Sequence, residues 1–205
     1  MLLPTDLPVK SSEIMYKIFC IGQNKTGTSS LAKALSRLEY KLCPEYIMYN
    51  FDSVHFKNFQ DGRFNETLNL ISQYDAFEDR PWNHTDFYKV LDKTYKGSKF
   101  ILTTRDAEQW WDSYIRWDKK IGLRDSWHYI INSQVCYGVD SFLDNPDLAK
   151  QIYLDRNDEI KNYFSGNTNF LVIDINEDHK YEKLCRFLNK KIPNESYPYL
   201  NRNDN

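Results

Sequence analysis

Short apolar runs alternate along this chain with longer segments that have helical periodicity, and this alternation constrains the fold more than any other feature. The clearest runs are "YKIFCI" at 16–21, "SKFILTT" at 98–104 and "NFLVIDI" at 169–175. Strands that are apolar along their whole length are typical of parallel sheets covered on both faces. Parallel strands need crossover connections, which the helical segments can supply. The sequence therefore predicts an α/β fold with a central parallel β-sheet flanked by helices.

Apolar residues recur every three or four positions between these runs, which is the spacing of a helix face packed on a sheet. After the first run, Leu31, Leu35 and Leu38 share one face of a helix expected over 29–38. A further short strand is expected at 74–79. The other expected helices cover 65–73, a segment capped by Thr85, 107–117, 125–136, 146–164 and 181–188.

Length, composition and charge are those of a globular protein. The chain has 205 residues, which suits one domain over 1–205, with flexible ends expected at 1–15 and 202–205. It is 41% hydrophobic and 16% aromatic, which is enough to build a buried core. The formal net charge is -2, so no global positive field favours binding to nucleic acid.

The four cysteines lie far apart, and none belongs to a Cys-x-x-Cys pair. A zinc site or a disulfide framework is therefore not expected, and the four histidines share no metal-ligand spacing. The N-terminal segment lacks the apolar core of a secretory signal, and no stretch approaches the length of a membrane span. We therefore expect a cytoplasmic protein that uses no metal.

A loop with two glycines, "GQNKTGTS", follows the first predicted strand. Gly22, Gly27 and Ser29 fit the phosphate-binding pattern Gly-x₄-Gly-Lys-Ser/Thr, but Thr28 stands at the lysine position. In an ATPase that lysine contacts the β- and γ-phosphates of ATP. Backbone N–H groups at the start of the next helix can still bind one phosphate. From the crest of the loop, Lys25 can neutralise charge on a group attached to that phosphate.

The stretch "KTGTSSL" resembles the phosphosulfate loop of sulfotransferases, where a basic and a hydroxyl residue precede Gly-Thr and a further hydroxyl. These enzymes have a P-loop NTPase-like α/β fold and use 3′-phosphoadenosine 5′-phosphosulfate (PAPS) without a metal. The 5′ end of PAPS carries one phosphate and one sulfuryl group, which explains the displaced lysine. The donor-binding residues implied in this loop are Gln23, Asn24, Lys25, Thr26, Gly27, Thr28, Ser29 and Ser30.

A second match begins at the end of the strand expected over 98–104. The sulfotransferases bind the 3′-phosphate of the donor with an arginine at a strand end and a serine eight residues later on the next helix. In "TTRDAEQWWDSY", Arg105 and Ser113 have this spacing. A guanidinium offers several N–H donors in one plane, and a serine hydroxyl can donate to the same phosphate. The resemblance therefore implies that Arg105 and Ser113 bind the 3′-phosphate.

A third match concerns the general base. Many sulfotransferases have a histidine after a middle strand, but one branch of the superfamily has an aspartate, and "YDAFEDRPW" puts Asp79 in that place. A carboxylate can accept the proton of an alcohol if burial raises its pKa. The resemblance thus implies that Lys25 and Asp79 are the catalytic residues. Glu78 is the second candidate for the base, and His84 could line the acceptor pocket.

The resemblance covers residues 16–201 and is weakest over 41–75. The segment "YLDRNDEI" departs from the branch, which often has His-Asn where this chain has Arg156 and Asn157. No role is therefore assigned to residue 156.

The expected function is the transfer of a sulfuryl group from PAPS to a hydroxyl or amine of a small-molecule, sugar or lipid acceptor. One alternative is a small-molecule or nucleotide kinase with a degenerate phosphate loop, although Thr28 replaces the lysine of that loop. The other alternative is a relative that binds a nucleotide but has lost catalysis.

Overall fold

The computed structural model describes residues 16–44, 61, 63, 71–84, 86–122, 133 and 139–200. Within these ranges, strands and helices alternate along the chain. In chain order, the elements are β1 (Ile18–Cys20), α1 (Thr28–Arg37), β2 (Ala76–Phe77), α5 (Phe87–Thr94), β3 (Lys99–Thr104), α6 (Ala107–Ile121), α8 (Pro146–Tyr163), β4 (Phe170–Asp174) and α9 (Lys180–Leu188).

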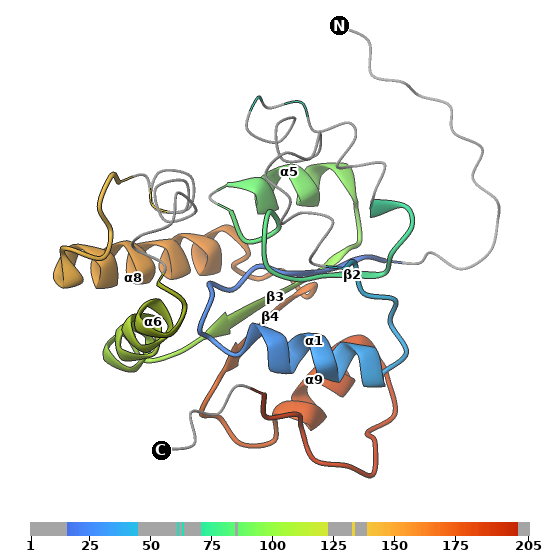
Figure 1. Ribbon diagram of the computed structural model, residues 1–205. Helices are drawn as coiled ribbons and strands as arrows, with labels where there is room; N and C mark the ends of the chain where they lie inside the picture. The colour runs from blue at the N-terminus through green and yellow to red at the C-terminus, as the bar shows by residue number, and fades with distance from the viewer. Residues whose placement is uncertain are drawn as a thin grey trace, which may run out of the picture.

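The four strands form one sheet in the order β2-β1-β3-β4, and every neighbouring pair is parallel. All four carboxyl ends therefore meet at one edge of the sheet, and β1 lies between β2 and β3. Helices cover both faces, with α1 and α9 on one side and α5 on the other (Figure 1). This arrangement confirms the predicted α/β fold with a central parallel sheet.

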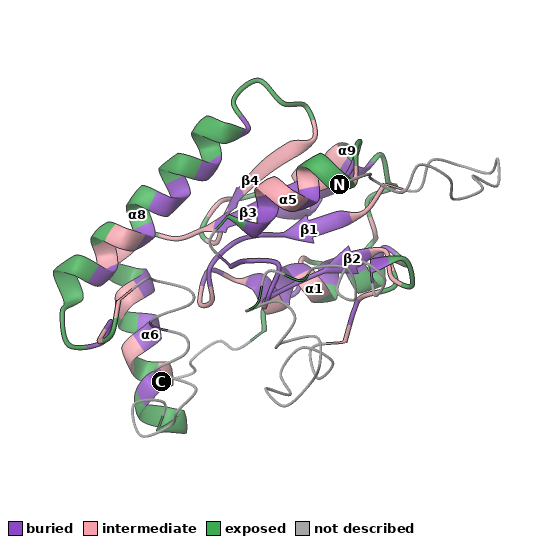
Figure 2. Ribbon diagram, turned by 90° about the horizontal axis from the view of Figure 1, so that it is seen from above, coloured by how far each residue is buried: buried purple, intermediate pink, exposed green. Residues whose placement is uncertain are grey.

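The side chains of β1 alternate between the two faces of the sheet, as in any strand. Ile18 and Cys20 join a buried cluster with Leu31 and Leu35 of α1 and Leu184 of α9. Figure 2 shows buried residues along β1 and in α1. Because β1 is buried on both faces, its sequence is continuously apolar, without the alternation of a half-exposed strand.

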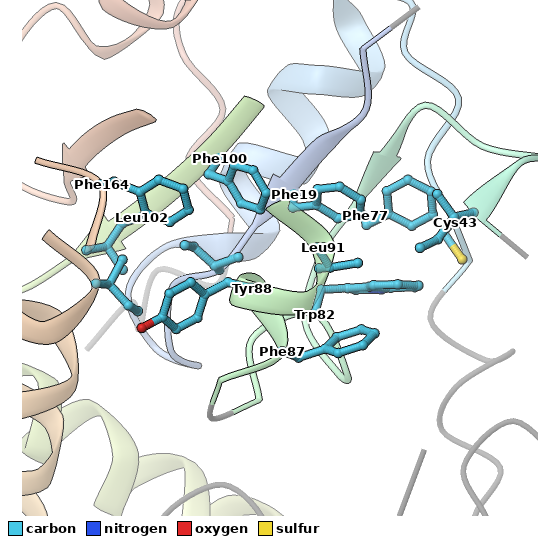
Figure 3. Packing of buried hydrophobic residues seen from close by; sticks show 13 residues of the cluster. Phe19, Cys43, Phe77, Trp82, Phe87, Tyr88, Leu91, Phe100, Leu102 and Phe164 are labelled. Carbon is cyan, nitrogen blue, oxygen red and sulfur yellow. The ribbon is translucent and has the colours of Figure 1, made fainter. Parts of the chain in front are cut away.

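The opposite face of the sheet is packed with aromatic rings (Figure 3). Phe19 of β1 stacks on Phe77 of β2 and on Phe100 of β3, with ring centroids 5.1 and 5.5 Å apart. Trp82 packs on Phe77 at 4.7 Å, and Leu91 of α5 covers the cluster. These contacts fix the chain after β2, which carries the candidate base.

Helix α6 packs against α8 and forms a third buried cluster. The indole of Trp110 stacks on the ring of Tyr153, with centroids 4.3 Å apart and planes 8° apart. The aromatic stripe of α6 thus packs in the core at Trp110 and Tyr114. This packing places the start of α6 beside the carboxyl end of β3.

One predicted strand and one predicted helix differ in length from those expected. The strand predicted over 74–79 contains only Ala76–Phe77, and Asp79 has a left-handed backbone with φ 63°, which a continuing strand does not allow. The helix predicted over 107–117 instead continues to Ile121 and ends at Gly122, a left-handed C-cap. Outside the described residues lie Thr85, the helix predicted over 125–136 except residue 133, and most of the helix predicted over 65–73.

Candidate active site

The loop between β1 and α1 closes tightly over the end of β3. A Cβ atom on Gly22 would lie 2.0 Å from Oγ1 of Thr103 and 2.8 Å from its backbone nitrogen, so only glycine fits without movement. Thr103 Oγ1 lies 2.6 Å from Oγ1 of Thr26, and the Thr26 hydroxyl donates to the Gln23 carbonyl at 2.5 Å. The loop then turns at Gly27, whose φ of 94° favours glycine, and α1 begins.

We expect Gly22→Ala to lower the free energy of unfolding by about 3 kcal/mol, because the added methyl group must displace the backbone of β3. Chemical denaturation of the two proteins measures this loss. Gly122→Ala is the comparison without crowding: Gly122 has open space around it, and the substitution should cost only the strain of its left-handed backbone, about 1 kcal/mol. Equal losses at the two positions would show that the loop moves away from Thr103 at little cost.

Lys25 occupies the crest of the loop, and its φ of 72° is uncommon for a residue with a side chain. Such conformations cluster at functional sites. Its Nζ lies 5.3 Å from the ring centroid of Trp117. Burial lowers the pKa of Lys25, and the positive charges of Arg105, Lys120 and Arg116 lower it further. Four cations therefore lie near one another, an arrangement that a bound anion stabilises.

Arg105 follows β3 directly, and both its backbone and its side chain form hydrogen bonds. Its backbone N–H donates to the hydroxyl of Tyr153, which donates to the Arg105 carbonyl, each at 2.9 Å. Its guanidinium donates to the Lys25 carbonyl at 3.3 Å. Burial lowers the pKa of Arg105, and the charge of Arg116 adds to this. Arg105 Nε is buried and has no hydrogen-bond partner among the residues that the structure describes, so it can donate to a ligand.

A cavity of about 330 Å³ brings the loop after β1 and the end of β3 together. Thr26, Gly27 and Ser30 line it from the loop and α1, and Arg105 and Ser113 line it from β3 and α6. An adjoining hollow of about 70 Å³ reaches the crest of the loop. The residues around this hollow are Lys25, Gly27, Thr28, Ser29, Ser30, Arg105, Ser113, Ile175 and Leu200.

Gln23 and Asn24, two of the predicted loop residues, line neither the cavity nor the adjoining hollow. Gln23 is buried, and its carbonyl accepts the hydrogen bond from Thr26. The carbonyl of Asn24 accepts from the indole N–H of Trp110 at 3.0 Å. Gln23 and Asn24 thus help to shape the loop, because their carbonyl groups accept hydrogen bonds from other groups of the protein.

The cavity is also lined by residues that were not predicted from the sequence. Arg116 lies one helical turn after Ser113 and lines the same cavity, so the i, i+3 spacing could have revealed it. The segment 197–200 closes another side, where the Leu200 N–H donates to Ser30 Oγ at 3.0 Å. Lys180 also lines the cavity and donates to the hydroxyl of Tyr199 at 3.2 Å. No local pattern in the tail predicts this contact.

Asp79 follows β2, on the other side of the loop after β1. It is buried, and its left-handed backbone turns the chain away from the sheet. The side-chain amide of Asn83 donates to Asp79 Oδ1 at 3.4 Å and to Asn24 Oδ1 at 3.0 Å. Asp79 does not line the 330 Å³ cavity with Arg105 and Ser113. It is connected to the loop through Asn83.

Glu78, the second candidate for the base, and His84, the residue expected near the acceptor pocket, are also buried. Glu78 lies close to Cys20, on the sheet face covered by α1: burial raises the pKa of that thiol, and the charge of Glu78 raises it further. His84 is only 1% exposed, and burial lowers its pKa to about 3, with Arg80 and Arg156 adding to the effect. A neutral imidazole with such a low pKa is a weak base at pH 7.

Two structural features are absent from the described segments. Within these ranges, no helix combines the length and apolar character that crossing a bilayer requires. The same ranges contain no group of three or more His, Cys, Asp or Glu side chains that could hold a metal ion.

Comparison with known proteins identifies the family. The family described as "Sulfotransferase domain" matches residues 17–205, which is nearly the whole chain. No curated protein matches the chain. The matched range contains the parallel sheet, the loop after β1 and the strand ends that carry Asp79 and Arg105. The chain therefore belongs to the sulfotransferase domain family.

Proposed function

We propose that this protein transfers a sulfuryl group from PAPS to a hydroxyl or amine of a small-molecule, sugar or lipid acceptor. The observation that carries the proposal is the shared cavity of the phosphate-binding loop, Arg105 and Ser113. A donor with a phosphate at each end of its ribose needs two anion sites close together. The N–H groups at the start of α1 form one such site, and Arg105 with Ser113 forms the other.

The residues present fit this donor in charge and in hydrogen bonding. The buried Nε of Arg105 has no partner within the described ranges, and a phosphate oxygen is a suitable acceptor for it. Burial lowers the pKa of Lys25 and of Arg105, the charge of Arg116 lowers both further, and a multiply charged anion would relieve that repulsion. Beyond these cations, Ile175 and Tyr199 offer an apolar wall against which a nucleobase can pack.

The order of the strands supports separate roles for Lys25 and Asp79. Because β1 lies between β2 and β3, its loop has Asp79 on one side and Arg105 on the other. PAPS supplies the sulfuryl group. Asp79 accepts the proton of the acceptor hydroxyl or amine. The ammonium of Lys25 and the N–H groups of the loop stabilise negative charge on the phosphate oxygen that leaves.

A transfer assay with PAPS tests the proposal, with alcohols, sugars, phenols and amines screened as acceptors. Sulfated product is the expected result. If PAPS binds but no acceptor is sulfated, a nucleotide-binding relative without catalysis is favoured. If ATP with Mg²⁺ binds and PAPS does not, a kinase is favoured.

Arg105→Ala should weaken the binding of adenosine 3′,5′-bisphosphate by about 1.5–3 kcal/mol, because a charged hydrogen bond to the 3′-phosphate is lost. Adenosine 5′-phosphate, which lacks that phosphate, should bind the variant and the wild type almost equally. Calorimetric titration of both nucleotides measures the difference. Arg63→Ala is a control, since that arginine is exposed and pairs with Asp61. An equal loss for the two nucleotides would show that Arg105 does not recognise the 3′-phosphate.

A further inference from the structure

Asn83 connects the two loops that carry the proposed catalytic residues. It is 3% exposed and lies in the turn after β2, where its backbone N–H donates to the Asp79 carbonyl at 3.1 Å. Its side-chain amide lies within 3.4 Å of Asp79 Oδ1 and of the Gly22 carbonyl, and 3.0 Å from Asn24 Oδ1. One amide group thus contacts the candidate base and two residues of the phosphate-binding loop.

Arg156 of α8 forms hydrogen bonds with both of these segments of the chain. It is 8% exposed, and one of its guanidinium nitrogens donates to the Asn83 carbonyl at 2.6 Å and to the Ile21 carbonyl at 3.1 Å. Ile21 is the last residue before the phosphate-binding loop, so Arg156 joins the base of that loop to the turn that carries Asp79. Burying a guanidinium costs free energy, and hydrogen bonds to buried carbonyls offset that cost.

We propose that Asn83 and Arg156 are positioning residues, which hold the Asp79 turn in a fixed place beside the phosphate-binding loop. The inference rests on the proposed function, because the proposed reaction uses residues on both of the loops that are connected. Proton removal at Asp79 and charge stabilisation at Lys25 must act on the two ends of one in-line transfer. Errors of about 1 Å in such an arrangement can cost about a hundredfold in rate. Buried contacts that join the two loops directly reduce such errors.

Hydrogen exchange measured by mass spectrometry tests the connection without any acceptor. In the wild type, adenosine 3′,5′-bisphosphate should slow exchange in the loop at 22–30 and also in the turn at 79–84. In Asn83→Ala, the loop should keep its protection and the turn should lose it. Wild-type protection confined to the loop would overturn the inference while leaving the proposed donor site intact. An absence of bisphosphate binding would instead contradict the proposed function.

Turnover in a double-mutant cycle tests whether Asn83 acts through Asp79. Asn83→Ala should lower kcat by about tenfold to a hundredfold in the wild-type background. In the Asp79→Asn background, the same change should cost at most about twofold, because the carboxylate that it positions is already absent. A full loss of rate in both backgrounds would overturn the inference, since a structural defect acts whether or not Asp79 is present.

Conservative variants keep the test informative if alanine destabilises the fold. Asn83→Asp has the same size but lacks the N–H donors, and should lose turnover much as alanine does. Arg156→Lys keeps the positive charge but offers a single ammonium, and should retain bisphosphate binding with a lower kcat. Melting temperatures establish that each variant is folded. Wild-type turnover in both Asn83→Asp and Arg156→Lys would contradict the positioning role.

Discussion

Replacing Asp79 with asparagine should lower the rate of sulfuryl transfer by about a hundredfold or more, which is the usual scale of general-base catalysis. The two side chains have nearly the same shape, so the buried turn around Asp79 should keep its structure. The asparagine cannot accept the acceptor's proton. Donor affinity should be unchanged, because Asp79 lies outside the cavity that contains Arg105 and Ser113. Steady-state kinetics and titration with adenosine 3′,5′-bisphosphate measure the two effects separately.

Glu78→Gln is the matched control for this experiment, since it removes the neighbouring carboxylate in the same isosteric way. It should retain most of the activity, because Glu78 lies near Cys20 on the α1 face of the sheet. Normal turnover in Asp79→Asn, together with a large loss in Glu78→Gln, would assign the base to Glu78. Normal turnover in both variants would direct attention to His84.

Lys25→Ala should lower kcat by about a hundredfold to a thousandfold, the effect of removing one group that stabilises developing charge. The cation should act most strongly in the transition state, when negative charge forms on the leaving oxygen, so kcat should fall more than donor affinity. Some affinity should also be lost, because Lys25 belongs to the cluster of cations at the cavity.

Lys33→Ala is the control for Lys25→Ala, because it removes an exposed lysine of α1, the helix that follows the loop. It should change neither turnover nor binding. If Lys25→Ala weakened bisphosphate binding as much as it lowered kcat/KM, Lys25 would contribute only uniform binding of the donor.

Much of the fold could be predicted because the strands and helices have strong local patterns. The runs at 98–104 and 169–175 are continuously apolar, and β3 and β4 lie within them. The extent of β2 could not be predicted from its sequence. Its end depends on the left-handed turn at Asp79, which Asn83 and the packed ring of Trp82 help to fix.

The candidate site was predictable where its residues lie close in sequence. Arg105 and Ser113 are eight residues apart, and a strand followed by a helix brings them to one cavity. The contacts of Arg156 with Ile21 and of Leu200 with Ser30 span more than 130 residues. Such contacts follow from the packing of α8 and of the tail on the sheet, for which a single sequence carries no local signal. The roles of all these residues stay predictions.

Calorimetric titration with adenosine 3′,5′-bisphosphate in the presence of EDTA tests the central claim most directly, because it probes the donor site without knowledge of the acceptor. We predict that the bisphosphate binds without a divalent metal. At a concentration one hundred times its Kd, it should also raise the free energy of unfolding by about 2.7 kcal/mol. Binding of ATP with Mg²⁺, together with no binding of the bisphosphate, would contradict the account.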